Sequence, residues 1–578
     1  MEYDRIEAIQ YHPDHHDHDH SSHLCKIVSN MKKLRYLSVT ILDRKNDTTE
    51  GPNFLSNELR YIRWENYPKS PLPDTFQPMN LVDLKLSKSL QKVLWKGYKH
   101  LPRLKVLELY HMKNLLSTPD FCGLPCLRKL TLCNCEELKE IHPSLGCHMG
   151  LEYVSILDCY KLKKFPTIIR MRNLGTLEIQ FCNDTLEFPE IQSNMESLVK
   201  LSLRYMRIDV LLSSIGERCV NLISLYLLNC TSLKSIEVDF DGLKHLEEFT
   251  LYGLNHLKTR NQLCISRLVS KVGCGKDWYT SHPSIRLWLT HSLTKLYLCD
   301  CGLRDGEIPS NIGELYNLQE LHLGGNDFTR LEISLLQLTR LKLLILDGCK
   351  ELVELPELPS GLYILYADTC HRLKAIGDFH KHCKYLSGVS LLYGSFIIGG
   401  ARLLETMLQG NAIEHHSMML CLQGIEIAKG FIPPLLRASK CTLKLPENWC
   451  NDFCGFLICF ISYRKILKWR HITLSMEHVM NDIDSQEDMV WDESDNDMYT
   501  RVWYVSFGSL RHTAWWDETK NMVSFSINMI CGGFGVRPVP WRSGSSPTQT
   551  SAHYDGESRY APKFRFLHDS AHGLDISF

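Results

Sequence analysis

Cysteine and histidine are the residue types in this sequence that could carry chemistry, because the 578 residues include 23 cysteines and 26 histidines. Thiolates act as nucleophiles and metal ligands, and imidazoles act as bases and metal ligands. Two local groups contain enough of these side chains to suggest a transition-metal site. They are the tract from His12 to His23 and the group Cys370, His371, His380, His382 and Cys383.

Neither group has the spacing of a built metal site. The tract from His12 to His23 is low in complexity, so we interpret it as a flexible loop with adventitious metal affinity. The spacing from Cys370 to Cys383 fits no common zinc module. Buried structural thiols are also the expectation for the aromatic stretch that contains Cys450, Cys454 and Cys459. We therefore predict no metal site, no cofactor and no catalytic centre.

The segment GCGK at residues 273–276 invites comparison with a phosphate-binding loop. That loop requires the pattern G-x-x-x-x-G-K-[ST], whose glycines let the backbone approach the phosphates and whose hydroxyl binds Mg²⁺. Here Ser270 stands in place of the first glycine and Asp277 in place of the hydroxyl residue. We therefore predict no nucleotide site in this segment.

The cysteines recur for a structural reason. In LRKLTLCNCEELKEIHPSLG, residues 127–146, the leucines and one cysteine follow the frame L-x-x-L-x-L-x-x-C. Further copies end at Cys159, Cys182, Cys230, Cys301, Cys349 and Cys370, and one ends at Asn326. A repeat of roughly 20–29 residues with this frame is typical of leucine-rich repeats. The frame predicts an α/β solenoid, a right-handed horseshoe with a parallel concave sheet, over residues 31–385, irregular at about 255–290.

The last position of the frame is predicted to be structural. In L-x-L both leucines point to the same side of a short strand, and the chain must then turn and leave backbone polar groups inside the coil. Asparagine can satisfy those groups, and cysteine is small, prefers burial and offers a weak S–H donor. The predicted spine comprises Cys135, Cys159, Cys182, Cys230, Cys301, Asn326, Cys349 and Cys370.

The polar positions of the strands are predicted to face a partner. Residues that alternate with the inward leucines must project from the opposite, concave side of the sheet. They mix charges with aromatic rings, which suits a protein surface better than a polyanion. The candidate contact residues are Lys129, Thr131, Glu178, Gln180, Lys200, Ser202, Arg204, Tyr226, Glu248, Tyr252, Lys295, Tyr297, Glu320 and His322.

Composition limits the function classes. The formal net charge of −1 argues against a nucleic-acid-binding protein, which usually has a basic stripe. Residues 1–25 contain no apolar signal segment, and the longest apolar stretch, residues 386–401, is shorter than the roughly 20 residues that span a membrane. We expect reduced thiols and a cytoplasmic location, with the nucleus as an open second location.

The chain changes character after residue 385. The segments 454–463, 501–510 and 522–539 are short, alternating and aromatic, which predicts an all-β sandwich. The predicted organisation is a His-rich linker remnant at 1–30, the solenoid at 31–385, a connector at 386–420, the β domain at 421–541 and a disordered tail at 542–578. The acidic stretch at 481–497 is expected to be a solvated loop.

Three stretches resemble one protein family. The first is NMKKLRYLSV (30–39) followed by residues 59–121, which include the paired Trp64 and Trp95. The second is CEELKEIHPSLG (135–146), and the third is LPENWCNDFCGFLICFI (445–461) with the later VWYVSFGSL and FGVRPV. They resemble the C-terminal half of plant Toll-type (TIR) nucleotide-binding leucine-rich-repeat disease-resistance proteins. The resemblance implies that the β domain is the family's C-terminal jelly-roll/Ig-like domain. It also implies that the repeats and this domain recognise a pathogen effector or a host protein.

The resemblance covers neither the family's Toll-type domain, which cleaves NAD in relatives, nor its nucleotide-binding module. The family's post-repeat motif Gly-x-Glu-Ile-Pro also departs here, because Ala428 replaces the proline after Gly424-Ile-Glu-Ile. Two functions therefore stay open. The chain is either the recognition part of a plant immune receptor or a standalone decoy or adaptor that binds proteins without signalling itself. A ubiquitin-ligase adaptor is a remote third interpretation, since no F-box is visible.

Overall fold

The structure is a computed structural model. It describes residues 5–12, 21–40, 50–182 except 69, 188–254 except 207, 209, 234 and 237, 291–374 except 309, 383, 385–394, 400–409, 417–463 except 433, 473–479, 498–540 except 529–530, 565–569 and 573–577. The chain forms two compact units, Met1–Leu293 and Thr294–Phe578. The predictions made for residues 255–290 and 481–497, and for the histidines at 380 and 382, lie outside the described residues.

The first unit is a solenoid built on one parallel sheet. Each strand pairs with the next strand of this sheet along the chain, without a register shift. Its strands are β1 (Ala8–Tyr11), β2 (Tyr36–Val39), β3 (Tyr61–Glu65), β4 (Asp83–Ser87), β5 (Val106–Tyr110), β6 (Lys129–Cys133), β7 (Tyr153–Leu157), β8 (Thr176–Gln180), β9 (Lys200–Arg204), β11 (Ser224–Leu228) and β13 (Glu248–Tyr252).

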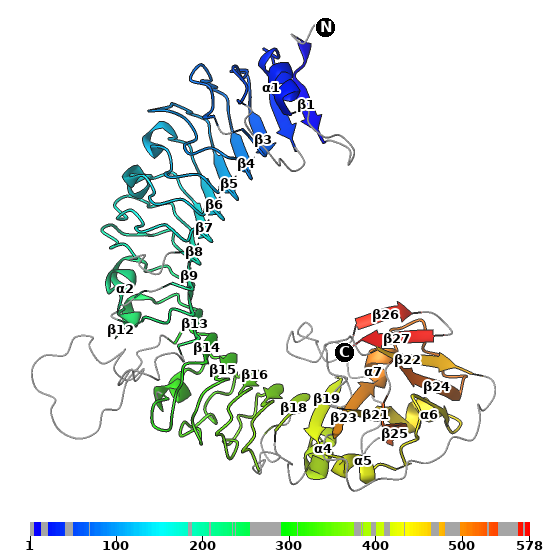
Figure 1. Ribbon diagram of the computed structural model, residues 1–578. Coiled ribbons are helices and arrows are strands. Elements are labelled where there is room, and N and C mark those ends of the chain that lie inside the picture. The colour runs from blue at the N-terminus through cyan, green and yellow to red at the C-terminus, as the bar shows by residue number, and fades with distance from the viewer. Residues whose placement is uncertain are drawn as a thin grey trace, which may run out of the picture. The chain divides into compact units, whose positions relative to one another are not determined.

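Among the residues that the structure describes, few helices cover the other side of this unit. They are α1 (Ser21–Ser29), α2 (Ser214–Arg218) and the 3-10 turns η2 (Phe121–Gly123), η3 (Pro143–Cys147) and η4 (Phe240–Gly242). A second, minor ladder joins β10 (Val210–Leu211) to β12 (Ser235–Ile236). Within this unit the strands follow the inner side of the curve, and α2 lies with the loops on the outer side (Figure 1). The prediction of a parallel-sheet repeat solenoid is confirmed.

The repeat frame explains the local structure. On β6, Leu130 and Leu132 are fully buried, as the period of two requires. The residue after the strand, Asn134, has a φ of 54°, a left-handed conformation that asparagine tolerates better than most residues. Its backbone N–H donates to the carbonyl of Leu157 in the next repeat at 2.9 Å. Each turn therefore both reverses the chain and bonds to its neighbour.

The predicted linker remnant at 1–30 needs correction where the structure describes it, because residues 8–11 form β1 and residues 21–29 form α1, whereas residues 13–20 lie outside the described residues. Strand β1 pairs in parallel with β2, with Ile9 opposite Leu37, and the buried side chains of α1 include Leu24 and Val28. The signal is the degenerate frame Ile6-x-x-Ile9-x-Tyr11, which contains no leucine. Because strand pairing depends on register and apolar size rather than on leucine itself, this segment can serve as an additional strand.

The second unit begins with a further run of parallel strands. Consecutive pairing extends from β14 to β19. The elements of this run are β14 (Lys295–Cys299), η6 (Ser310–Glu314), β15 (Glu320–His322), β16 (Leu343–Ile345), β17 (Ile364–Tyr366), β18 (Gly388–Leu391), α4 (Gly400–Gln409) and β19 (Met418–Gln423).

The predicted connector at 386–420 is therefore wrong, because it contains β18, α4 and the start of β19. The frame continues in Leu386, Val389 and Leu391, which are all buried. Gly394 stands where earlier repeats have cysteine. A Cβ atom at Gly394 would lie 3.0 Å from the carbonyl oxygen of Cys370, so the turn is tight even for a small side chain.

The rest of the second unit is a two-sheet β domain. Strand β19 also pairs antiparallel with β23, which pairs with β21, which pairs with β25. The second sheet has the order β20-β24-β22-β27-β26. The elements are α5 (Glu426–Lys429), β20 (Lys440–Lys444), α6 (Trp449–Asp452), β21 (Phe453–Tyr463), β22 (Thr473–His478), β23 (Met498–Ser506), α7 (Phe507–Leu510), β24 (Met522–Ile527), β25 (Gly533–Pro540), β26 (Arg565–Asp569) and β27 (Gly573–Ser577).

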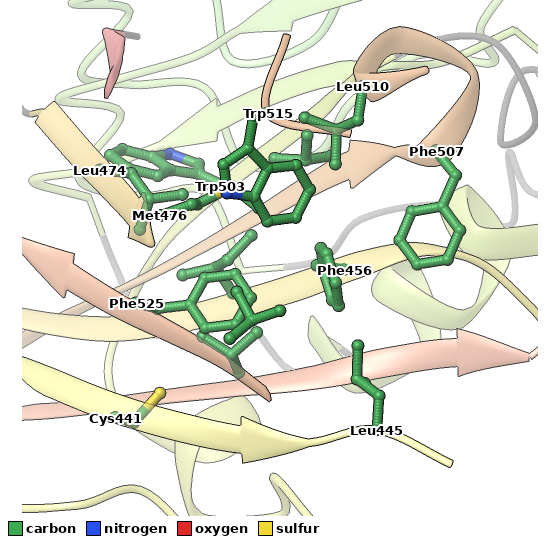
Figure 2. Packing of buried hydrophobic residues seen from close by; sticks show 14 of the residues in the cluster. Cys441, Leu445, Phe456, Leu474, Met476, Trp503, Phe507, Leu510, Trp515 and Phe525 are labelled. Carbon is green, nitrogen blue, oxygen red and sulfur yellow. The ribbon is translucent and has the colours of Figure 1, made fainter. Parts of the chain in front are cut away.

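An aromatic core fills the space between these two sheets. Phe456 and Trp503 come from the first sheet, Phe525 comes from the second, and all three are almost completely buried (Figure 2). The ring of Phe456 lies 4.9 Å from that of Phe507 and 5.0 Å from that of Phe525, both in edge-on geometry. Apolar burial and edge-to-face contacts therefore hold the sheets together.

The predicted disordered tail also needs correction in its last part. Residues 573–577 form β27, which pairs with β22, and residues 565–569 form β26 beside it. The alternation in RFLHD and GLDIS is too short to stand out in a polar segment. Pairing with an existing strand edge supplies the backbone partners that such short segments cannot provide for themselves.

Candidate protein-binding face

The spine asparagine occupies the inside of its turn. The side-chain amide of Asn326 donates to the carbonyls of Leu298 and Leu323, both at 2.7 Å. Its carbonyl oxygen accepts from the backbone N–H groups of Cys301 and Leu303, both at 3.1 Å. One buried side chain thereby bonds four backbone groups in two adjacent repeats.

The spine cysteines occupy the equivalent turns. Their thiols lie near backbone carbonyls, at 3.3 Å between Cys349 Sγ and the Leu323 oxygen and at 3.2 Å between Cys370 Sγ and the Leu346 oxygen. Burial raises the pKa of Cys349 to about 12, so its thiol stays protonated at neutral pH. The other spine positions are Cys135, Cys159, Cys182 and Cys230, all buried, and the partly buried Cys301. The geometry fits structural thiols rather than nucleophiles.

A carboxylate missing from the predicted set organises the first part of the concave face. Glu108 on β5 is only 4% exposed and bonds Lys129 at 2.6 Å and Lys85 at 3.1 Å. Burial by itself would raise the pKa of Glu108, but the hydrogen bonds from the two lysines outweigh burial and lower it. The alternation in LKVLELY (104–110) points Glu108 outward and could have identified it.

A second group gathers predicted residues from β8 to β13. Lys200 bonds Glu178 at 2.7 Å, and its ammonium lies 5.7 Å from the ring centre of Tyr226. The guanidinium of Arg204 lies 5.8 Å from the same ring, and the hydroxyl of Tyr226 donates to Glu248 at 2.6 Å. Alternating charges and a central ring hold these side chains in one arrangement.

Other predicted contact residues offer less surface. Thr131 and Ser202 are buried between their neighbours on the sheet, and Ser202 accepts a hydrogen bond from Arg204 Nε at 3.0 Å. Gln180 is partly buried, whereas Tyr252 is exposed. The central group, defined as Glu178, Lys200, Arg204, Tyr226, Glu248 and Tyr252, is therefore the better candidate for contact.

The predicted residues of the second unit form a separate group on β14 and β15. Glu320 accepts a hydrogen bond from the hydroxyl of Tyr297 at 2.7 Å and pairs with Lys295 at 3.3 Å. The rings of Tyr297 and His322 lie 4.1 Å apart. The next strand presents Leu343 and Ile345 at the equivalent positions, so the face becomes apolar there.

A partly buried carboxylate lies at the end of β16, close to this group. Asp347 accepts a hydrogen bond from the backbone N–H of Asp368 at 2.8 Å, and His322 is near enough to interact electrostatically. Burial raises the pKa of Asp347 to about 6. Between about pH 4 and 6 the folded chain therefore holds a proton that the unfolded chain releases. Stability from this residue accordingly decreases as the pH rises through this window.

Replacement of Asp347 by asparagine is expected to remove this pH dependence. The amide side chain keeps an oxygen acceptor for the Asp368 N–H but carries no charge, so we expect a gain of about 1 kcal/mol at pH 7 and little change at pH 4. Urea unfolding of D347N and the unsubstituted chain across this range measures the difference. A difference independent of pH would show that the carboxylate charge is not its cause.

A Ser-His-Asp combination on the loops does not form a catalytic relay. His142 Nδ1 lies 2.7 Å from Ser144 Oγ and 3.6 Å from Asp120 Oδ1. A relay needs the serine and the carboxylate on different ring nitrogens, whereas both contact the same one here. Within the described part of the chain, no group of three or more His, Cys, Asp and Glu residues is placed to hold a metal ion. None of the described helices is long and apolar enough to cross a membrane.

The chain has relatives among characterised proteins, although no family model matches it. The TMV resistance protein N of Nicotiana glutinosa is 28% identical over 533 residues, which cover 85% of this chain and 46% of that protein. The disease resistance-like protein DSC1 of Arabidopsis thaliana is 30% identical over 440 residues, 70% of this chain and 35% of that protein. The chain thus spans less than half the length of these relatives. Among solved structures, the Leptospira interrogans LRR protein LIC12759 is 20% identical with a TM-score of 0.38, covering 61% of this chain and 90% of that one.

Proposed function

The chain is homologous to the plant TIR-NB-LRR disease resistance proteins over most of its length, and from this we propose that it is a recognition module of plant defence. It binds a pathogen effector or a host protein through the concave face of its repeats and through the C-terminal β domain. It acts by binding rather than by catalysis, and it works in the cytoplasm, with the nucleus as an open second location.

The central group on β8 to β13 is the observation that supports this proposal most directly. Tyrosine and arginine are, with tryptophan, the residues enriched among strong contacts in protein interfaces. Here the cations of Lys200 and Arg204 lie 5.7 and 5.8 Å from the ring centre of Tyr226. Glu178 accepts a hydrogen bond from Lys200, and Glu248 accepts one from the hydroxyl of Tyr226. A partner would therefore meet side chains that have already lost much of their rotamer freedom, which lowers the cost of binding.

The β domain is proposed to supply a second binding surface. Its two antiparallel sheets and aromatic core fit the jelly-roll/Ig-like domain that follows the repeats in this family. Continuous pairing from β18 through β19 to β23 joins this domain to the last repeats of the second unit. Within this unit, the last repeats and the β domain therefore share one sheet, and a partner that binds either of them contacts part of that sheet.

Two mechanisms fit this role. In a complete receptor, partner binding would shift the population from a resting to an active state, which requires that the partner contact the two states differently. Alternatively, the chain acts as a standalone decoy or adaptor and only pairs with other proteins. Partner recognition by the concave face is common to both mechanisms.

Reversal of charge in the central group is expected to abolish partner binding without unfolding. The double substitution Lys200→Glu and Arg204→Glu places new carboxylates beside Glu178 and removes both cations from the ring of Tyr226. We expect at least about a tenfold loss in recovery of specific partners from challenged leaf tissue by affinity purification and mass spectrometry.

A control with the same change in net charge is Lys161→Glu with Lys244→Glu, two exposed lysines outside the strands. Circular dichroism should show the same folded content for both double variants. The proposal fails if the control loses the same partners, or if the central variant keeps all of them.

A further inference from the structure

An exposed aromatic pair lies on the first strands of the first unit. Tyr36 begins β2 and is 41% exposed, and Tyr61 begins β3 and is 45% exposed. The two residues are opposite each other in the parallel register, with ring centres 6.4 Å apart. Large apolar side chains on a sheet face are normally buried against other residues, so two adjacent exposed rings indicate a contact surface.

Two arginines adjoin this pair. Arg60 precedes Tyr61, Arg63 follows it on the same side of β3, and both are exposed. In the sheet, Arg63 lies between Ser38 and Lys85, so neither neighbour in register offers it a carboxylate. Neither guanidinium forms an ion pair with any described residue. We call Tyr36, Arg60, Tyr61 and Arg63 the amino-terminal patch.

Three lysines of this concave face contrast with the arginines of the amino-terminal patch. Lys85 and Lys129 share the carboxylate of Glu108, and Lys200 bonds Glu178. Those cations are therefore neutralised within the face. Arg63 does interact electrostatically with Asp83, but Asp83 also lies 3.8 Å from Lys85. The amino-terminal patch thus combines two exposed rings with two guanidinium groups that form no ion pair with a described residue.

We propose that the amino-terminal patch docks an acidic segment of a partner protein that also carries apolar or aromatic side chains. This inference rests on the proposed function and assigns the chemistry of one part of its surface. Carboxylates can bind the planar guanidinium groups of Arg60 and Arg63 in bidentate fashion. Apolar side chains of the same segment would cover the rings of Tyr36 and Tyr61.

An acidic polypeptide fits the patch better than a nucleic acid does. Nucleic-acid binding depends on many cations along an extended path, and affinity scales with the number of phosphates neutralised. The amino-terminal patch offers two guanidinium groups, one just before β3 and one on it, and the neighbouring lysines of this face are already paired. Two guanidinium groups are sufficient to bind the carboxylates of a short acidic segment.

The test uses fluorescence anisotropy with three labelled probes and the whole chain. The first probe is the acidic peptide (Glu-Tyr-Asp-Leu)3, the second replaces its acids with lysine, and the third is twelve-nucleotide oligo-dT. The variants are Arg60→Glu with Arg63→Glu, and Tyr36→Ser with Tyr61→Ser. Lys105→Glu with Arg128→Glu is the matched control, because Lys105 and Arg128 occupy the same row as Arg60 in later repeats.

We expect the acidic peptide to bind and the lysine peptide not to bind. The arginine variant should bind the acidic peptide with an affinity at least about tenfold lower than that of the unsubstituted chain. The loss of affinity should be about threefold for the tyrosine variant and less than about twofold for the control. The proposal is overturned if the unsubstituted chain does not bind the acidic peptide, if the control loses as much affinity, or if oligo-dT binds more tightly through the same residues.

This outcome is separable from that of the proposed function. Partner recovery lost in the Lys200→Glu and Arg204→Glu variant, combined with unchanged peptide binding in the Arg60→Glu and Arg63→Glu variant, would refute the amino-terminal patch and leave the recognition role intact. Peptide binding that depends on Arg60 and Arg63, without any partner that depends on the central group, would support the patch and refute the role of the central group.

Discussion

Replacement of Asn326 by leucine is expected to lower the free energy of unfolding of its repeats by about 4 kcal/mol. The amide of Asn326 bonds the carbonyls of Leu298 and Leu323, and its oxygen bonds the N–H groups of Cys301 and Leu303. Leucine has a similar size but leaves these four backbone groups without a partner inside the turn. An unsatisfied buried group costs about 1–3 kcal/mol, and partial relaxation reduces the sum.

The replacement of Asn326 by cysteine is the matched control. Cysteine occupies the equivalent turn at Cys349 and Cys370, where the thiol lies 3.2–3.3 Å from a carbonyl oxygen. We expect N326C to cost about 1–2 kcal/mol, because the thiol restores one weak donor. Urea unfolding followed by circular dichroism, with hydrogen exchange of residues 295–326, measures both variants. Equal losses for leucine and cysteine would show that size rather than hydrogen bonding decides this position.

Replacement of Phe456 by alanine is expected to destabilise the β domain by about 4 kcal/mol. Phe456 is fully buried, and its ring packs edge-on against Phe507 and Phe525. Alanine would leave a cavity between the two sheets. The surrounding rings belong to different elements, so they cannot move together to fill this cavity. Because β21 lies between β23 and β25, the loss should extend across the first sheet of the domain.

Hydrogen exchange measured by mass spectrometry can localise this effect. Residues 453–463 and 498–506 should exchange faster in F456A, whereas residues 200–228 of the first unit should keep their protection. Ile432→Ala is the control, since Ile432 is 77% exposed and its truncation should cost less than about 0.5 kcal/mol. Unchanged protection in β21 and β23 would mean that the aromatic core does not hold the sheets together.

The repeat frame was sufficient to predict the solenoid, because a period of two within each strand and a constant spacing between strands leave little choice of fold. It also identified Asn326 and the cysteine turns, since any such turn leaves backbone groups to be satisfied. The frame failed to predict repeats in which other residues replace its characteristic leucine and cysteine. Strand β1 has isoleucine and tyrosine in place of leucine. The repeat that contains β18 has Gly394 in place of the cysteine at the last position of the frame.

The sequence by itself therefore determined the repeat architecture, the buried leucines, the turn residues and the side of each strand that faces outward. These are local properties, set by side-chain alternation and backbone bonding within one repeat. The tertiary structure alone decided how outward residues of different repeats combine. Register places Glu108 opposite Lys85 and diagonal to Lys129, and it places Arg63 beside Ser38 and Lys85. Which charges are neutralised and which remain available depends on neighbours one repeat or more away in sequence, and a single repeat carries no information about them.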